Sequence, residues 1–63
     1  SIRIVIIRPS LRAMYDSFSL IKKYKLDFDD ALVVSSMNEN GIKDLVSYDK
    51  HFKKVKEINL IGP

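Results

Sequence analysis

This sequence of 63 residues contains no cysteine. Neither disulfide bonds nor a thiolate metal site can therefore hold the fold together, so a hydrophobic core has to do so. Long apolar runs are missing as well, because the longest, at residues 4–7, is far shorter than the ~20 residues of a membrane-spanning helix. That run also lacks the small-residue cleavage site of a signal peptide. We therefore expect a cytoplasmic protein with no membrane segment and, since it begins with Ser1, a processed product.

Several ligand-binding motifs are also absent. The sequence contains neither a glycine-rich phosphate loop nor a dinucleotide fingerprint, and it lacks the spacing of zinc ligands. What it has is a small positive excess, +3 at pH 7, with a pI near 9.3. This excess is compatible with nucleic-acid binding, but many domains that bind no nucleic acid carry the same charge. The 46% of hydrophobic residues indicates a globular chain.

The hydrophobic pattern predicts an α/β fold. The expected elements are a strand at 2–7, a helix at 11–23, a second helix from 28 to about 40, a strand at 45–47, a loop or single helical turn at 50–56, and a strand at 58–61. Helices between strands imply crossover connections and hence a parallel sheet. In the first helix, spacings of three and four predict one apolar face, made of Leu11, Met14, Tyr15, Phe18 and Ile21.

Two carboxylates are candidates for a metal site. Asp49 follows the strand at 45–47, and ligands of α/β sheets gather outside the carboxyl ends of strands. Asp30 lies at the start of the second helix, which would bring it to the same edge if that helix runs antiparallel to the strand. Carboxylates are the ligands that Mg²⁺ and Mn²⁺ prefer. The alternatives are a helix-start charge for Asp30 and a turn residue for Asp49, and spacing alone leaves the choice between Asp29 and Asp30 open.

Polar neighbours of Asp49 extend this candidate site. Ser47 lies one side-chain period earlier, so its hydroxyl can face the same way and orient the carboxylate. His51 is the only histidine, and it is either a proton-transfer group or an ordinary surface residue. The lysines that follow predict contacts to a nucleic-acid backbone or, equally, a solvated turn; the candidates are Lys50, Lys53 and Lys54.

Three segments together, at residues 24–34, 38–41 and 45–52, resemble the C-terminal half of a PIN domain, most closely the VapC-type toxin ribonucleases. The resemblance implies an α/β domain that cuts RNA with Mg²⁺ or Mn²⁺ held by acidic residues. It also implies that Asp30 is the third acid of that cluster, Asp49 the fourth, and Ser47 the hydroxyl residue before it. The family's first two acids and its N-terminal central strand precede the matched half, and His51 stands where many members have another acid.

The resemblance implies partners as well. Family members cut RNA, pair with an antitoxin protein and often form homodimers. A sheet without its central strand exposes open backbone edges, so we expect a homo-oligomer or a complementing N-terminal fragment to cover them. Two other functions remain open: a non-catalytic interaction module that binds an antitoxin-like partner or its own copy, and a basic RNA-binding module without hydrolysis.

Overall fold

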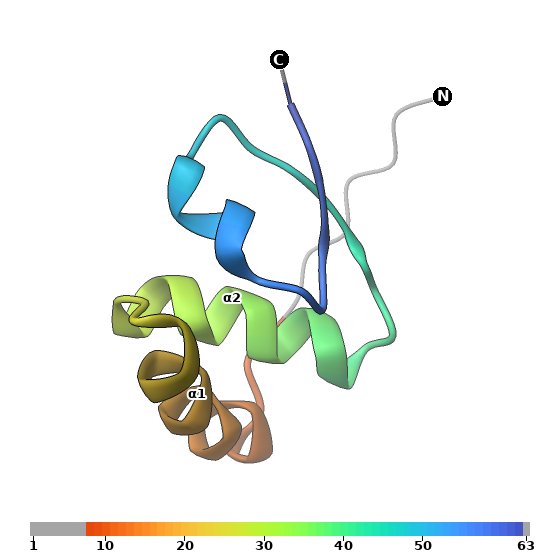
Figure 1. The fold of residues 1–63 in the computed structure, drawn as a ribbon. Helices are drawn as coiled ribbons and strands as arrows, with labels where there is room; N and C mark the ends of the chain where they lie inside the picture. Colours follow the sequence, from red (N-terminus) through yellow and green to blue (C-terminus); the bar gives the residue numbers. More distant parts are fainter. Residues whose placement is uncertain (1–7, 63) are drawn as a thin grey trace.

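The chain forms a small α/β fold in which the second helix lies between the first helix and the strands. The computed structural model describes residues 8–62, so the strand predicted at 2–7 lies outside the described part. The elements are α1 (Leu11–Tyr24), α2 (Phe28–Glu39), β1 (Asp44–Val46), the 3-10 helix η1 (Lys50–Lys54) and β2 (Asn59–Ile61). Figure 1 shows α1 on one side of α2, with the two strands and η1 on the other. The predicted order of elements 11–61 is therefore confirmed.

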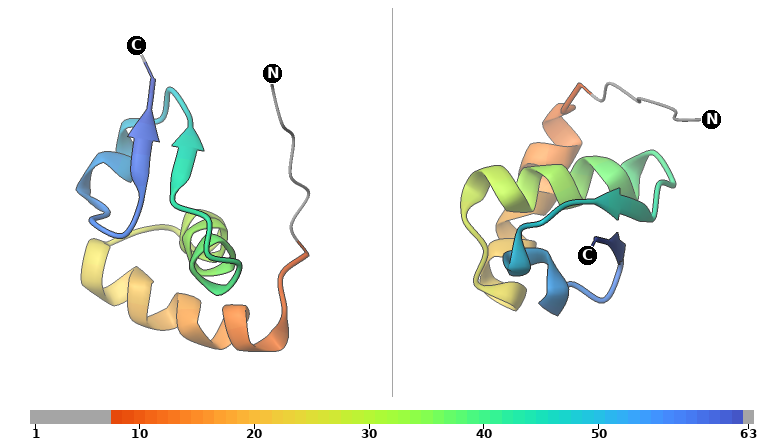
Figure 2. Two further views of the ribbon diagram at one scale, coloured as in Figure 1. Left: turned by 90° about the vertical axis from the view of Figure 1, so that its right-hand side faces the viewer. Right: turned by 90° about the horizontal axis from the view of Figure 1, so that it is seen from above.

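The two strands are parallel, as expected for the predicted parallel sheet. Their register pairs Asp44 with Asn59, Leu45 with Leu60, and Val46 with Ile61. One further hydrogen bond extends the pairing, from the backbone amide of Ser47 to the carbonyl of Ile61 at 3.1 Å. Figure 2 shows the two arrows side by side and pointing the same way. Both strands consequently deliver the chain to one edge, where the residues after β1 lie.

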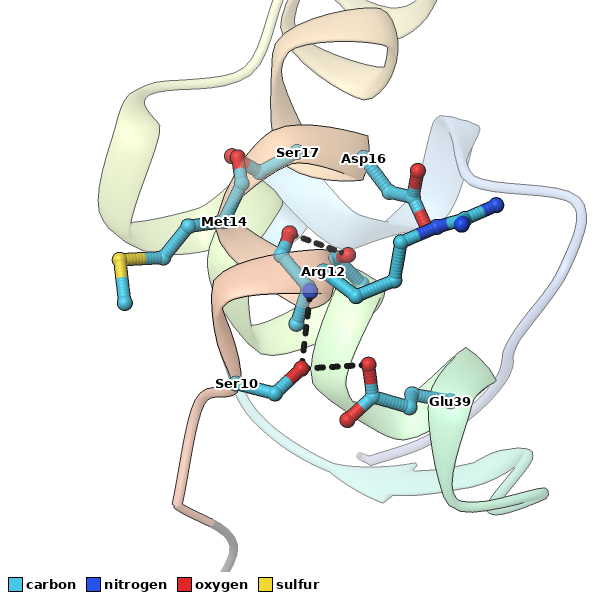
Figure 3. A network of polar contacts seen from close by, with 8 residues as sticks. Ser10, Arg12, Met14, Asp16, Ser17 and Glu39 are labelled. Carbon is cyan, nitrogen blue, oxygen red and sulfur yellow. Dashed lines mark hydrogen bonds and ion pairs between the residues drawn. The ribbon is translucent and has the colours of Figure 1, made fainter.

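Serine hydroxyls tie α1 to α2. The Oγ of Ser10 accepts a hydrogen bond from the Ala13 amide at 3.0 Å, which makes Ser10 the N-cap of α1. The same hydroxyl donates to the Glu39 carboxylate at 2.6 Å (Figure 3). Ser35, buried on α2, donates its hydroxyl proton to the Ala13 carbonyl, also at 2.6 Å. These bonds join the start of α1 to the second half of α2.

The apolar face predicted for α1 is wrong for three of its five residues. Leu11 and Tyr15 are 83% and 74% exposed, and Phe18 is exposed as well, whereas Ile21 is partly buried against the core. The buried residues of α1 are Ala13, Ser17, Leu20 and Tyr24, of which Ala13 and Ser17 are fully buried. Small side chains let two helices approach closely, and a pattern that counts only large apolar residues misses such a face.

The core lies between α2, the end of α1 and the C-terminal segment. Its buried members are Leu20, Tyr24, Leu26, Ala31, Val34, Met37, Phe52, Val55 and Ile58. The second half of α2 contributes most of its buried residues, whereas Val33 is exposed. Phe52 is the member that η1 contributes, so it attaches the segment after β1 to the helices.

An ion pair between Lys23 and Glu57 joins the end of α1 to the turn before β2. The ammonium of Lys23 lies 3.0 Å from the Glu57 carboxylate. Hydrogen bonding to Glu57, and then to Tyr24, holds the pKa of Lys23 above its ordinary 10.5. Burial alone would raise the pKa of Glu57, but the interactions with Tyr24 and Lys23 outweigh burial and leave that pKa below its ordinary 4.5.

These shifts predict a pH window for the contribution of the pair to stability. A lowered carboxyl pKa stabilises the fold above pH 4.5, and that stabilisation is lost as the pH falls through the folded-state pKa of Glu57. A raised lysine pKa stabilises it below pH 10.5, and that contribution is lost as the pH rises through the folded-state pKa of Lys23. We expect urea unfolding to show Glu57→Gln less stable than wild type at pH 7 but not at pH 3. An equal difference in the free energy of unfolding between the two proteins at both pH values would contradict an origin in this ion pair.

Candidate metal centre

Asp30, Asp49 and His51 come together beside the N-terminus of α2. A carboxylate oxygen from each aspartate and a ring nitrogen of His51 all lie within 4.8 Å of one another. After α2 the chain doubles back along it through β1 (Figure 1), so the start of the helix lies near the residues that follow the strand. The two aspartates that topology predicted to meet therefore lie together, while their role as metal ligands stays a prediction.

Asp49 is held by two short-range hydrogen bonds. Its carboxylate oxygen Oδ1 accepts from the backbone amide of His51 at 2.9 Å and thereby caps η1. Its own amide donates to the Ser47 hydroxyl at 3.0 Å. Ser47 thus contacts the backbone of Asp49, and its role in orienting the Asp49 carboxylate or a metal-bound water stays a prediction. The cap also shows that the alternative for Asp49, a turn residue, is one of its actual roles.

His51 lies between the two acids. Its Nδ1 is 3.2 Å from Asp49 Oδ1 and 3.7 Å from Asp30 Oδ2. A protonated ring would form an ion pair with both carboxylates, which repel each other at this separation. Sequence analysis left His51 outside the candidate metal site. The sequence signal that could have indicated His51 is its position two residues after Asp49. An aspartate whose carboxylate accepts a hydrogen bond from the amide two residues later brings the side chain of that residue close to the carboxylate.

Asp30, rather than Asp29, is the acid at the start of α2 that takes part. Asp30 is half-buried and its carboxylate reaches His51, whereas Asp29 is exposed. Both lie in the first turn, where the helix dipole favours negative charge. Asp27 is the N-cap by backbone geometry, as predicted, although its side chain makes no capping hydrogen bond within residues 8–62.

The three candidate lysines follow on η1. Lys50, Lys53 and Lys54 are all exposed. The ammonium of Lys54 donates to the Lys25 carbonyl at 3.3 Å, just beyond the end of α1. The Lys54 side chain is therefore already bound next to the C-terminal end of α1. Lys50 and Lys53 are the better candidates for contacts to a phosphate backbone. Nucleic-acid binding by any of the three stays a prediction.

The donor set suits a divalent cation. Mg²⁺ is bound in proteins through one or two carboxylates and keeps several water molecules, and Mn²⁺ accepts the same oxygen ligands. Asp49 and His51 are exposed to solvent, which leaves room for those waters and for a substrate oxygen. Asp30 and Asp49 are therefore the residues that would hold such an ion.

A separate cleft of about 590 Å³ lies between α1 and α2. Its charged side chains are Arg12, Asp16, Lys23, Glu39 and Glu57. Contacts within the chain already engage them, because Arg12 pairs with Asp16 at 3.2 Å, Lys23 pairs with Glu57, and Glu39 accepts from a serine hydroxyl (Figure 3). Most of the charge lining the cleft is therefore engaged within the chain, although Oε2 of Glu57 is buried without a hydrogen-bond partner among residues 8–62.

No known protein family, curated protein or solved structure matches this chain. Among residues 8–62, none of the helices has the length and apolar character required to cross a membrane. A proposal about function therefore has to rest on the geometry of the cluster and on the resemblance of the sequence motifs.

Proposed function

We propose that this chain is the C-terminal part of a PIN-like, VapC-type ribonuclease, in which Asp30 and Asp49 hold Mg²⁺ or Mn²⁺. One observation carries the proposal: ligand atoms of Asp30, Asp49 and His51, from two separate elements, lie within 4.8 Å of one another. Core packing does not require two carboxylates at the same edge. Their meeting is the arrangement that a metal-dependent nuclease needs.

A bound divalent cation supplies the activation of water for attack on an RNA phosphodiester. Asp30 and Asp49 bind and orient that cation. Ser47 positions Asp49 through its backbone amide, so it acts on the orientation of the ligand. Lys50 and Lys53, exposed on η1, neutralise the phosphates of the RNA strand.

The remaining acids of a complete site come from outside this segment. Asp30 and Asp49 correspond to the third and fourth acids of the family pattern. A second copy of the chain or a preceding N-terminal segment therefore supplies the first and second acids. The protein partner that follows from the same resemblance is an antitoxin. RNA is the substrate.

We expect Asp30→Asn and Asp49→Asn each to lower the affinity for Mn²⁺ by at least about 10–100-fold, the loss typical of removing even a residue that only orients a ligand. Titration calorimetry measures this directly. Asparagine at position 49 keeps the cap of η1, because asparagine caps helices as well as aspartate does. Metal-dependent cleavage of a labelled single-stranded RNA, compared in the same three proteins, is expected to fall with the affinity.

Asp29→Asn is the matched control for these variants. It removes the same charge from the same helical turn, but Asp29 is exposed and lies outside the cluster. Metal affinity should therefore stay within about twofold of wild type. No metal binding by wild type would overturn the metal centre, and metal binding without RNA cleavage would overturn catalysis by this segment alone.

A second candidate, an interaction module, is favoured by the exposed face of α1. Leu11, Tyr15 and Phe18 lie on this face, and the Phe18 ring meets that of exposed Phe28 at 6.1 Å between centroids. Exposed apolar clusters commonly mark protein interfaces. Self-association that persists in Asp30→Asn and Asp49→Asn, without metal binding, would favour this module over the nuclease. Salt-sensitive RNA binding that ignores both substitutions would favour an RNA-binding module instead.

A further inference from the structure

We propose that His51 supplies a nitrogen ligand to the metal centre, so that the site prefers Zn²⁺ over Mg²⁺. This inference rests on the proposed metal centre of Asp30 and Asp49 and assigns its ion specificity. In the family pattern an acid often stands at this position, and an imidazole there changes the chemistry of the donor set.

The distances around His51 are close to those of a coordination sphere. Two neighbouring ligands, each about 2.1 Å from an ion and at right angles, are about 3 Å apart. Nδ1 of His51 lies 3.2 Å from Asp49 Oδ1 and 3.7 Å from Asp30 Oδ2. Small side-chain rotations therefore suffice to bring the three donors around one ion.

The local backbone fixes the ring beside its neighbour. Because Asp49 Oδ1 accepts from the His51 amide at 2.9 Å, the carboxylate and the imidazole belong to one turn. Phe52, the next residue, is buried in the core and anchors that turn. Asp30 approaches from α2, so the donors are supplied by two elements whose positions the core sets. A ligand set arranged before the ion arrives loses less entropy on binding.

Imidazole nitrogen selects among divalent ions. It suits zinc, iron and nickel, whereas Mg²⁺ demands oxygen ligands and retains its water. Two carboxylates alone would favour Mg²⁺, Ca²⁺ or Mn²⁺. Adding one nitrogen should therefore strengthen the binding of Zn²⁺ while leaving that of Mg²⁺ almost unchanged.

A different role for His51 makes the opposite prediction. If the ring is only a cation that pairs with both carboxylates, it competes with the metal ion for them. His51→Ala would then raise the affinity for every divalent ion, Mg²⁺ included. If His51 is a ligand, by contrast, its loss lowers the affinity for Zn²⁺ but not that for Mg²⁺. The sign of the change separates the two roles.

The composition of the chain removes competing zinc ligands from the experiment. His51 is the only histidine and there is no cysteine, so an untagged protein has a single imidazole and no thiolate to compete for zinc. Wild type, His51→Ala and the control Asp29→Asn are titrated with Zn²⁺, Mn²⁺ and Mg²⁺ at pH 7.5 by calorimetry. Nitrogen-15 NMR of the wild-type ring follows Nδ1 during the Zn²⁺ and Mg²⁺ titrations.

We expect His51→Ala to lower the affinity for Zn²⁺ by about 10–100-fold and that for Mg²⁺ by less than about twofold. The Nδ1 resonance should shift with Zn²⁺ but not with Mg²⁺. Unchanged Zn²⁺ affinity in His51→Ala, in a protein whose metal binding still needs Asp30 and Asp49, would overturn the role of His51 and leave the metal centre standing. Absence of metal binding by wild type would overturn both.

Discussion

Phe52→Ala is expected to leave much of the protein unfolded at 25 °C. The side chain is 7% exposed and belongs to the hydrophobic core, to which η1 contributes no other member. Truncating a buried phenylalanine costs about 3–5 kcal/mol. A domain of this length has a total stability of only about 3–9 kcal/mol. The substitution therefore removes between a third and all of the free energy of unfolding.

Circular dichroism during urea unfolding measures this loss. The matched control is Phe28→Ala, because Phe28 is 43% exposed and its main aromatic neighbour is the exposed Phe18. Loss of that ring pair costs at most about 1.5 kcal/mol. Equal destabilisation by the two substitutions would contradict the central place of Phe52 in the core. Phe52→Leu, which keeps most of the buried volume, should retain the fold.

Gly62→Ala is expected to destabilise the fold and to disturb the metal centre together. A Cβ at position 62 would lie 2.6 Å from the carbonyl oxygen of Ser47, a backbone atom that cannot rotate away. Overpacking of this kind costs about 1–3 kcal/mol. Ser47 also accepts a hydrogen bond from the Asp49 amide, so a displacement of Ser47 would displace Asp49 as well. Calorimetry should therefore show weaker Mn²⁺ binding in this variant.

Gly41→Ala separates that local effect from a general loss of stability. Gly41 has a φ of 67° and nothing lies within 4 Å of the position its Cβ would take. Alanine there costs about 1–2 kcal/mol through the left-handed backbone alone. Since Gly41 lies between α2 and β1, away from the cluster, Mn²⁺ affinity should stay at the wild-type level. Equal metal affinity in the two glycine variants would show that Gly62 does not position the site.

Local sequence signals predicted the elements well. The helix predicted at 11–23 begins at Leu11 as expected and ends one residue later, at Tyr24. The strand predicted at 45–47 is found at Asp44–Val46, and the last strand at Asn59–Ile61. Caps, turns and short apolar runs act within a few residues, so their effect can be read without knowledge of the tertiary structure.

Side-chain neighbours were harder to predict. Topology alone brought Asp30 and Asp49 to one edge, because a helix that precedes a strand and runs against it starts where the strand ends. The position of His51 depended on the cap that Asp49 makes, which fixes the turn only when η1 forms. The buried face of α1 depended on Ala13 and Ser17, whose small size matters only against α2. Such features are set by packing, which a pattern of hydrophobicity does not contain.

The separation of Asp30 from Asp49 and His51 along the chain couples ion binding to the stability of the fold. Asp30 lies on α2, whereas Asp49 caps η1 and His51 lies on it, so the three donors come together only in the folded chain. An ion that bound all three would therefore bind the folded state and not the unfolded one. Its binding would raise the free energy of unfolding as the ion concentration increases.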